Sequence, residues 1–86
     1  MMFETKSEEI MYNWLSKFFE SLRLKEPIVT YEEILIAIKH DKEVSEYQDD
    51  YETIDSALDA LKAMRIIEFT YNPDEYFMDT EFEICL

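Results

Sequence analysis

The chain has 86 residues, with 8 Lys and Arg against 21 Asp and Glu, and therefore a formal net charge of −13. Its hydrophobic content of 48% is too high for a disordered acidic tail, so we expect one folded domain over residues 1–86. Glycine is absent from the sequence, which excludes Gly-rich phosphate loops, dinucleotide-binding fingerprints and nucleophile elbows.

Acidic charge is concentrated in two stretches. Residues 43–60 hold seven acidic residues and residues 66–86 hold six, and neither stretch contains a Lys or Arg. Such a surface repels nucleic acid and anionic membranes and attracts basic partners, although the same charge is equally expected of a domain that is only kept soluble. The first residues lack the basic region of a signal peptide, so we expect a cytoplasmic protein.

The first helix is predicted to begin near residue 6 and to end at about Leu24. Thr5 and Glu8 have the spacing of a capping box. Large apolar residues then recur every four positions, which is typical of the buried face of a helix. They are Ile10, Trp14, Phe18 and Leu22.

A short extended segment and a second helix follow. Pro27 disfavours helix at the preceding residue, so residues 26–29 are predicted to be extended. Thr30 and Glu33 form another capping box, which predicts a helix from about Tyr31 to Lys39. The polar stretch 40–50 is predicted to be a loop or to carry one weak turn of helix.

A third helix is predicted to begin after Asp49 or Asp50 and to end at about Met64. The apolar period then changes from about four to two, which indicates strands. Residues 67–71 and 76–84 are predicted to pair as an antiparallel hairpin around the turn residues 72–75. The expected core combines all three helices with the first of these strands: Trp14, Phe18, Leu22, Leu35, Ile38, Ile54, Leu58, Leu61, Ile67 and Phe69.

This order, helix-strand-helix-helix followed by a β-hairpin, resembles the winged helix-turn-helix fold. The resemblance is most specific at residues 56–68, which look like a recognition helix entering the first wing strand. It implies an α+β, winged-helix-like domain. Arg65 stands where the family commonly has a glycine between helix and strand.

The resemblance does not extend to the residues that read DNA. Family members that bind DNA carry basic and amide side chains on the recognition helix and on the wing. The matching positions here are mostly acidic: Glu52, Thr53, Asp55, Ser56 and Asp59 on the helix, and Asp74 and Glu75 at the wing tip. We therefore expect no direct binding of nucleic acid.

The predicted partner-binding surface consists of these acidic residues and two tyrosines. A scaffold that kept its shape but reversed its charge would meet a basic protein where its relatives meet DNA. Tyrosine is enriched at the centres of protein interfaces. The predicted residues are Glu52, Asp55, Asp59, Asp74, Glu75, Tyr12 and Tyr76.

Three other features contain residue types that are found in catalytic or metal-binding sites. His40 is followed by Asp41, a pair that acid–base chemistry could use, but a histidine at a solvated helix end is the interpretation we prefer. Cys85 lies among acidic residues, which disfavour a thiolate. Residues 41–52 match the acidic positions of a calcium-binding loop, but Glu46 replaces the glycine required at its sixth position. We expect no catalytic residue, metal or cofactor.

Three functions compete. The first is a small non-catalytic protein-binding module, in its sharpest form a DNA-mimicking inhibitor of a basic nucleic-acid-binding host protein. Phage anti-restriction and anti-CRISPR proteins are similar in type. The second is a winged-helix transcription regulator whose few basic residues converge on DNA. The third is an enzyme, for which the sequence offers no nucleophile and base pair. Self-association into a homodimer is an open alternative for the partner.

Overall fold

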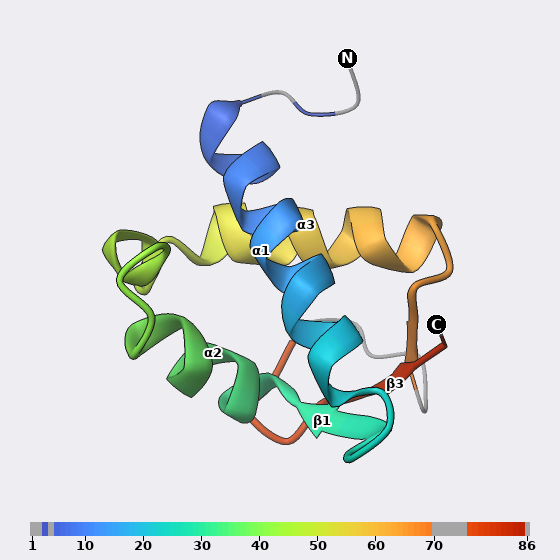
Figure 1. The fold of residues 1–86 in the computed structure, drawn as a ribbon. Coiled ribbons are helices and arrows are strands. Elements are labelled where there is room, and N and C mark those ends of the chain that lie inside the picture. Colours follow the sequence, from blue (N-terminus) through green and yellow to red (C-terminus); the bar gives the residue numbers. More distant parts are fainter. Residues whose placement is uncertain (1–2, 4, 70–75, 86) are drawn as a thin grey trace.

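The computed structural model describes residues 3, 5–69 and 76–85 and has an α+β fold of three helices and an antiparallel three-stranded sheet (Figure 1). The predicted α+β class is confirmed, and the arrangement is compatible with a winged-helix-like domain. In chain order the elements are α1 (Lys6–Leu22), β1 (Ile28–Thr30), α2 (Tyr31–Lys39), the short 3₁₀ helix η1 (Ser45–Tyr47), α3 (Tyr51–Ala63), β2 (Ile67–Phe69) and β3 (Glu81–Ile84).

The predicted capping residues start all three helices. Thr5 accepts a hydrogen bond from the backbone N–H of Glu8, and Asp50 accepts one from that of Thr53. Thr30 and Glu33 form both halves of the predicted capping box. These side chains satisfy backbone donors that have no partner within the helix, which fixes where each helix begins. At its other end, α1 stops at Leu22, two residues before the predicted end.

The sheet has β3 in its centre, with β1 and β2 antiparallel on either side. The predicted pairing of the two C-terminal strands is therefore confirmed, but β3 begins at Glu81 instead of residue 76. The segment before it turns instead, and the N–H of Thr80 donates to the carbonyl of Phe77. The carbonyls of Thr80 and Met78 accept from the first two N–H groups of α2, so this turn anchors the start of that helix.

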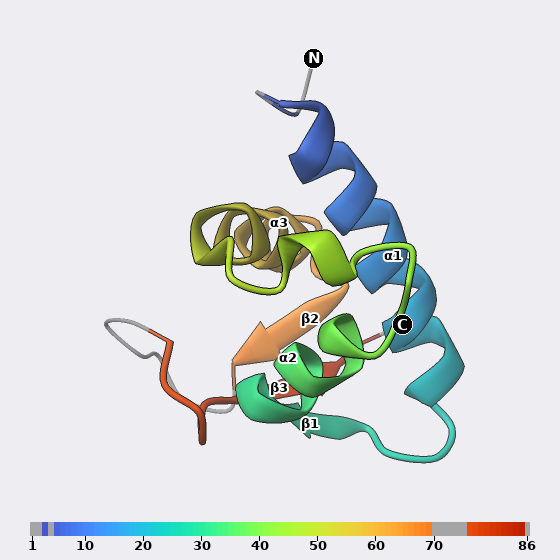
Figure 2. The ribbon, with the colours of Figure 1, turned by 90° about the vertical axis from the view of Figure 1, so that its left-hand side faces the viewer.

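The core lies where α1 crosses α3 above the sheet (Figures 1 and 2). Trp14, Ile38, Ile54, Leu58, Leu61 and Ile67 are buried as predicted. Phe18, Leu22, Leu35 and Phe69, which the prediction places within the core, are only partly buried and pack against it. The apolar stripe of α1 is two columns wide, and its contact with α3 buries the column that the prediction left out: Met11, Leu15 and Phe19.

The link between α2 and α3 is anchored by one apolar side chain. Val44 is fully buried, and η1 follows it directly. The N–H of Tyr47 donates to the carbonyl of Val44, and that of Asp50 to Tyr47. A short turn of 3₁₀ helix thus leads the chain to the cap of α3. None of the described helices has the length and apolar character needed to cross a bilayer.

Arg65 follows α3 in the left-handed backbone conformation, which favours glycine. Its φ is 61°, and it is the only non-glycine residue with positive φ in the described part of the chain. The N–H of Ile66 donates to the carbonyl of Leu61, and that of Arg65 to Lys62, each at 3.0 Å. This pair of bonds is the Schellman motif. Arg65 therefore bears the steric strain of its Cβ in this conformation.

We predict that Arg65→Gly stabilises the protein by up to about 1 kcal/mol, because glycine adopts the left-handed conformation without that strain. Arg23 provides a matched control, since it follows α1 with a right-handed φ of −53°. Arg23→Gly should destabilise by about 0.5–1 kcal/mol. Urea unfolding measures both variants, and a loss of stability in Arg65→Gly would contradict the assignment.

Candidate partner-binding surface

The outer face of α3 carries three of the predicted acidic residues in one row. The inner face of this helix is buried through Ile54, Leu58 and Leu61. Glu52, Asp55 and Asp59 follow at intervals of three and four residues, so they share the opposite side. Asp55 and Asp59 are one turn apart, about 6 Å along the helix axis.

The Asp55 side chain does not project freely into solvent, because a tyrosine holds it. The phenol of Tyr31, the first residue of α2, donates a 2.6 Å hydrogen bond to Oδ1 of Asp55. Tyr31 itself is buried, and Asp55 is partly buried beside it. Burial raises the pKa of the Asp55 carboxyl above its ordinary value, the Tyr31 hydrogen bond counteracts this shift, and the nearby charge of Asp59 adds to it.

Asp59 is also held by a tyrosine. The phenol of Tyr76 donates to Oδ1 of Asp59, and the rings of Tyr76 and Tyr31 lie 5.5 Å apart. Tyr76 also contacts the rings of Phe69, at 5.7 Å, and Phe82, at 5.6 Å. Burial, and then the hydrogen bonds to the aspartates, raise the pKa of both phenols well above the usual tyrosine value. Both tyrosines therefore remain protonated donors at neutral pH.

The row ends in a basic residue that is also paired. Lys62 forms a 3.2 Å ion pair with Glu68 of β2, and its ammonium lies 5.9 Å from the ring centre of Phe69. Glu52, at the other end of the row, is exposed. The surface formed by Glu52, Asp55, Asp59, Tyr31 and Tyr76 is called the acidic face below. Two of its three carboxylates are held in place by phenol donors.

The structure groups some of the predicted site residues and separates others. Tyr76 joins Glu52, Asp55 and Asp59 in the acidic face. Asp74 and Glu75 lie outside the described residues. Tyr12 lies on α1, partly buried, and its ring lies 4.9 Å from that of Phe3.

Tyr31 is the residue of the acidic face that sequence analysis missed. The capping box at Thr30 predicts that Tyr31 begins a helix, and this prediction is correct. No local pattern, however, indicates that its phenol reaches Asp55, which lies 24 residues further along the chain.

The three other candidate features adopt ordinary structural roles. The backbone N–H of His40 donates to the carbonyl of Ile36 at the end of α2, and the His40 side chain is exposed. In the segment that resembles a calcium loop, Oδ1 of Asp41 accepts from the N–H of Glu43, and Asp50 caps α3. Among the residues that the structure describes, no three His, Cys, Asp or Glu gather as a metal site.

Cys85 lies exposed after β3. Desolvation and the carboxylates of Glu68 and Glu83 raise the pKa of its thiol, and Lys62 lowers it by less. A raised pKa opposes the thiolate that a cysteine nucleophile requires. The surroundings of this thiol are therefore those of an unreactive cysteine.

Comparisons of the chain with protein-family models, with curated proteins and with solved structures find no match. The acidic face is therefore interpreted from its own geometry and charge.

The hydrogen bond between Tyr31 and Asp55 can be tested by titration. The Tyr31 bond favours the ionised carboxylate, so Tyr31→Phe should raise the pKa of Asp55 further. Tyr51→Phe is the matched control, because Tyr51 lies on α3, the helix that also carries Asp55, and its side chain is 47% exposed. NMR detection of the carboxyl carbon measures the pKa, and an unchanged or lowered value in Tyr31→Phe would contradict the assignment.

The same carboxyl predicts a pH-dependent stability. Because the folded pKa of Asp55 is raised, its ionisation destabilises the folded state at neutral pH, and this penalty disappears as the pH falls through the folded pKa. Asp55→Asn keeps an acceptor for Tyr31 but removes the charge. Its stability relative to the wild type should be greatest near neutral pH and should decline on acidification.

Proposed function

We propose that this chain is a small non-catalytic protein-binding module with a winged-helix-like topology, and that its acidic face binds a basic, nucleic-acid-binding protein in place of DNA. The observation that carries the proposal is the row of Glu52, Asp55 and Asp59 on α3, with two of the carboxylates fixed by Tyr31 and Tyr76. In the winged-helix family, this helix is the one that enters the major groove.

Fixed carboxylates suit a binding surface better than mobile ones do. A side chain already held in one conformation loses less conformational freedom when a partner binds. Phenol donors hold the carboxylates in place and leave their negative charge intact, whereas a Lys or Arg partner would neutralise it. The row therefore remains available to positive charge, and complementary charge chiefly accelerates association and sets specificity. This chemistry is that of a DNA-mimicking inhibitor or modulator, the phage anti-defence type of protein.

The proposal can be tested with amide substitutions, which remove the charge of each side chain but keep one of its acceptor oxygens. The triple variant Glu52→Gln, Asp55→Asn, Asp59→Asn should lose proteins that the wild type captures from a cell lysate. Duplex DNA should displace those same proteins from the wild type. The matched control removes three exposed charges from other elements, through Glu20→Gln, Glu43→Gln and Glu83→Gln. Equal capture by both variants, or capture that duplex DNA does not reduce, would refute the proposed function.

The alternative, a transcription regulator, requires the chain itself to bind DNA. On α3 and at its end, the only basic residues are Lys62 and Arg65, and Lys62 is paired with Glu68. A net charge of −13 also opposes the release of counterions that drives nonspecific binding. We therefore predict no gel shift of random duplex DNA at about 150 mM salt. Micromolar binding there would favour the regulator instead.

A further inference from the structure

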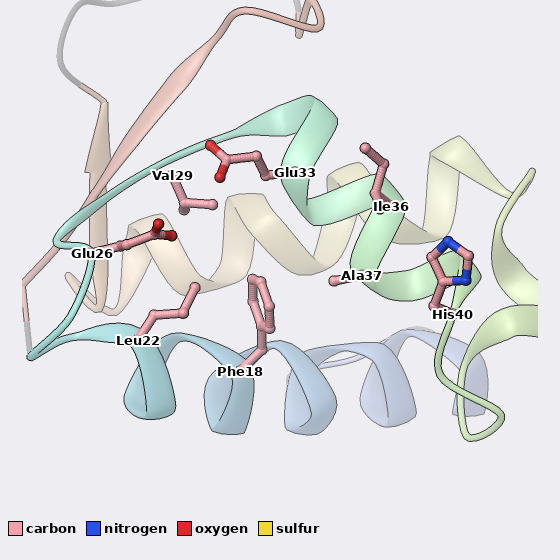
Figure 3. Close-up of a pocket in the computed structure, with 8 residues that line it drawn as sticks. All are labelled: Phe18, Leu22, Glu26, Val29, Glu33, Ile36, Ala37 and His40. Atoms are coloured by element: carbon pink, nitrogen blue, oxygen red, sulfur yellow. The ribbon is translucent and has the colours of Figure 1, made fainter.

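A hollow of about 320 Å³ opens between α1, β1 and α2 (Figure 3). Its walls are apolar. Phe18 and Leu22 line it from α1, Val29 from β1, and Ile36 and Ala37 from α2. None of its lining residues belongs to the acidic face, although α2, which helps to form the hollow, also supplies Tyr31 to that face. The hollow is therefore a feature separate from the proposed DNA-mimicking surface.

The polar residues of the hollow lie at its two ends (Figure 3). Glu26 and Glu33 stand at the end near β1, and His40 stands at the other. Glu33 is held in place, because its Oε1 accepts bonds of 3.0 and 3.1 Å from the backbone and hydroxyl of Thr30. Glu26 is exposed. Among the described residues, no Lys or Arg lines the hollow, so one end of an apolar site carries two carboxylates.

The apolar wall reaches the surface at Ile36. This side chain is 51% exposed, although it projects from the middle of α2. It also lines a neighbouring hollow of about 290 Å³, together with Tyr51 and Met78. Ile36 thus forms an apolar ridge between two depressions. Large apolar side chains at the edge of a concave site are typical of protein-binding surfaces.

We propose that this hollow binds the apolar side of a positively charged amphipathic segment of a partner protein. Leu- or Phe-sized side chains would fill the space between Phe18, Val29 and Ile36, as in helix-in-groove recognition. Lys or Arg residues beside them would meet Glu26 and Glu33. Charge complementarity selects this occupant, because an acidic segment would be repelled. A second copy of the chain is a less favourable occupant, because two molecules that each carry a net charge of −13 repel one another.

The test is NMR titration of the ¹⁵N-labelled full chain with two synthetic amphipathic peptides of identical pattern, one of Leu and Lys and one of Leu and Glu. The Leu/Lys peptide should shift the amide signals of Val29, Ile36 and Ala37 to saturation. The Leu/Glu peptide should leave them unchanged. The α3 triple amide variant should retain this binding, so failure of the proposed function and failure of this proposal give different results.

A pair of double variants tests the site itself. Ile36→Ser with Glu26→Gln should weaken binding of the Leu/Lys peptide about tenfold, the loss expected when an apolar anchor and a charge contact are removed together. Met64→Ser with Glu20→Gln is the matched control, because Met64 is also half exposed, at 53%, and Glu20 is exposed. Thermal melting verifies that both variants are folded.

Four results would overturn the proposal. The first is no shift with the Leu/Lys peptide, or shifts confined to α3. The second is equal binding of the Leu/Glu peptide, which would show that the carboxylates do not select the occupant. The third is equal weakening by both double variants. The fourth is a concentration-dependent shift at Ile36 without any peptide, which would identify a second copy of the chain as the occupant.

Discussion

The crossing of α1 over α3 is the contact on which the positions of the other elements depend (Figure 1). Met11, Leu15 and Phe19 of α1 and Ile54, Leu58 and Leu61 of α3 are all fully buried. Apolar burial of this kind is the main favourable contribution to the folding of a small domain. In this chain it must also outweigh the mutual repulsion that accompanies a net charge of −13. The remaining elements complete the core around this crossing.

The same crossing determines which residues of α3 are available for function. With Leu58 and Leu61 facing inward, the carboxylates of Asp55 and Asp59 emerge beside the start of α2 and the residues that precede β3. Tyr31 and Tyr76 come from these two places and donate to the carboxylates. Polar groups that are partly buried require hydrogen-bond partners. The acidic face therefore joins α3 to neighbouring parts of the fold through hydrogen bonds, and it also presents negative charge at the surface.

The acidic face and the hollow between α1 and α2 differ in physical character. The face is a polar row in which charge dominates, so its association with a partner would depend strongly on salt. The hollow is an apolar concavity with carboxylates at one end only, so burial of apolar side chains would provide most of its affinity. Both surfaces carry carboxylates, and they share no residue. A small domain with two such surfaces can contact two segments of one protein or two different proteins.

The sequence by itself determined the order of the helices and strands and the residues at which the three helices begin, because the deciding interactions are local. The capping side chains Thr5, Thr30 and Asp50 act within three residues of themselves. The change of apolar period after Arg65 likewise marked the end of the last helix and predicted the antiparallel pair that follows. Only the tertiary structure decided that Met11, Leu15 and Phe19 are the fully buried side chains of the apolar stripe on α1, since that depends on the partner helix. It also decided that Tyr31 and Tyr76 hold Asp55 and Asp59, because these bonds join residues 24 and 17 positions apart, where no local pattern specifies contact.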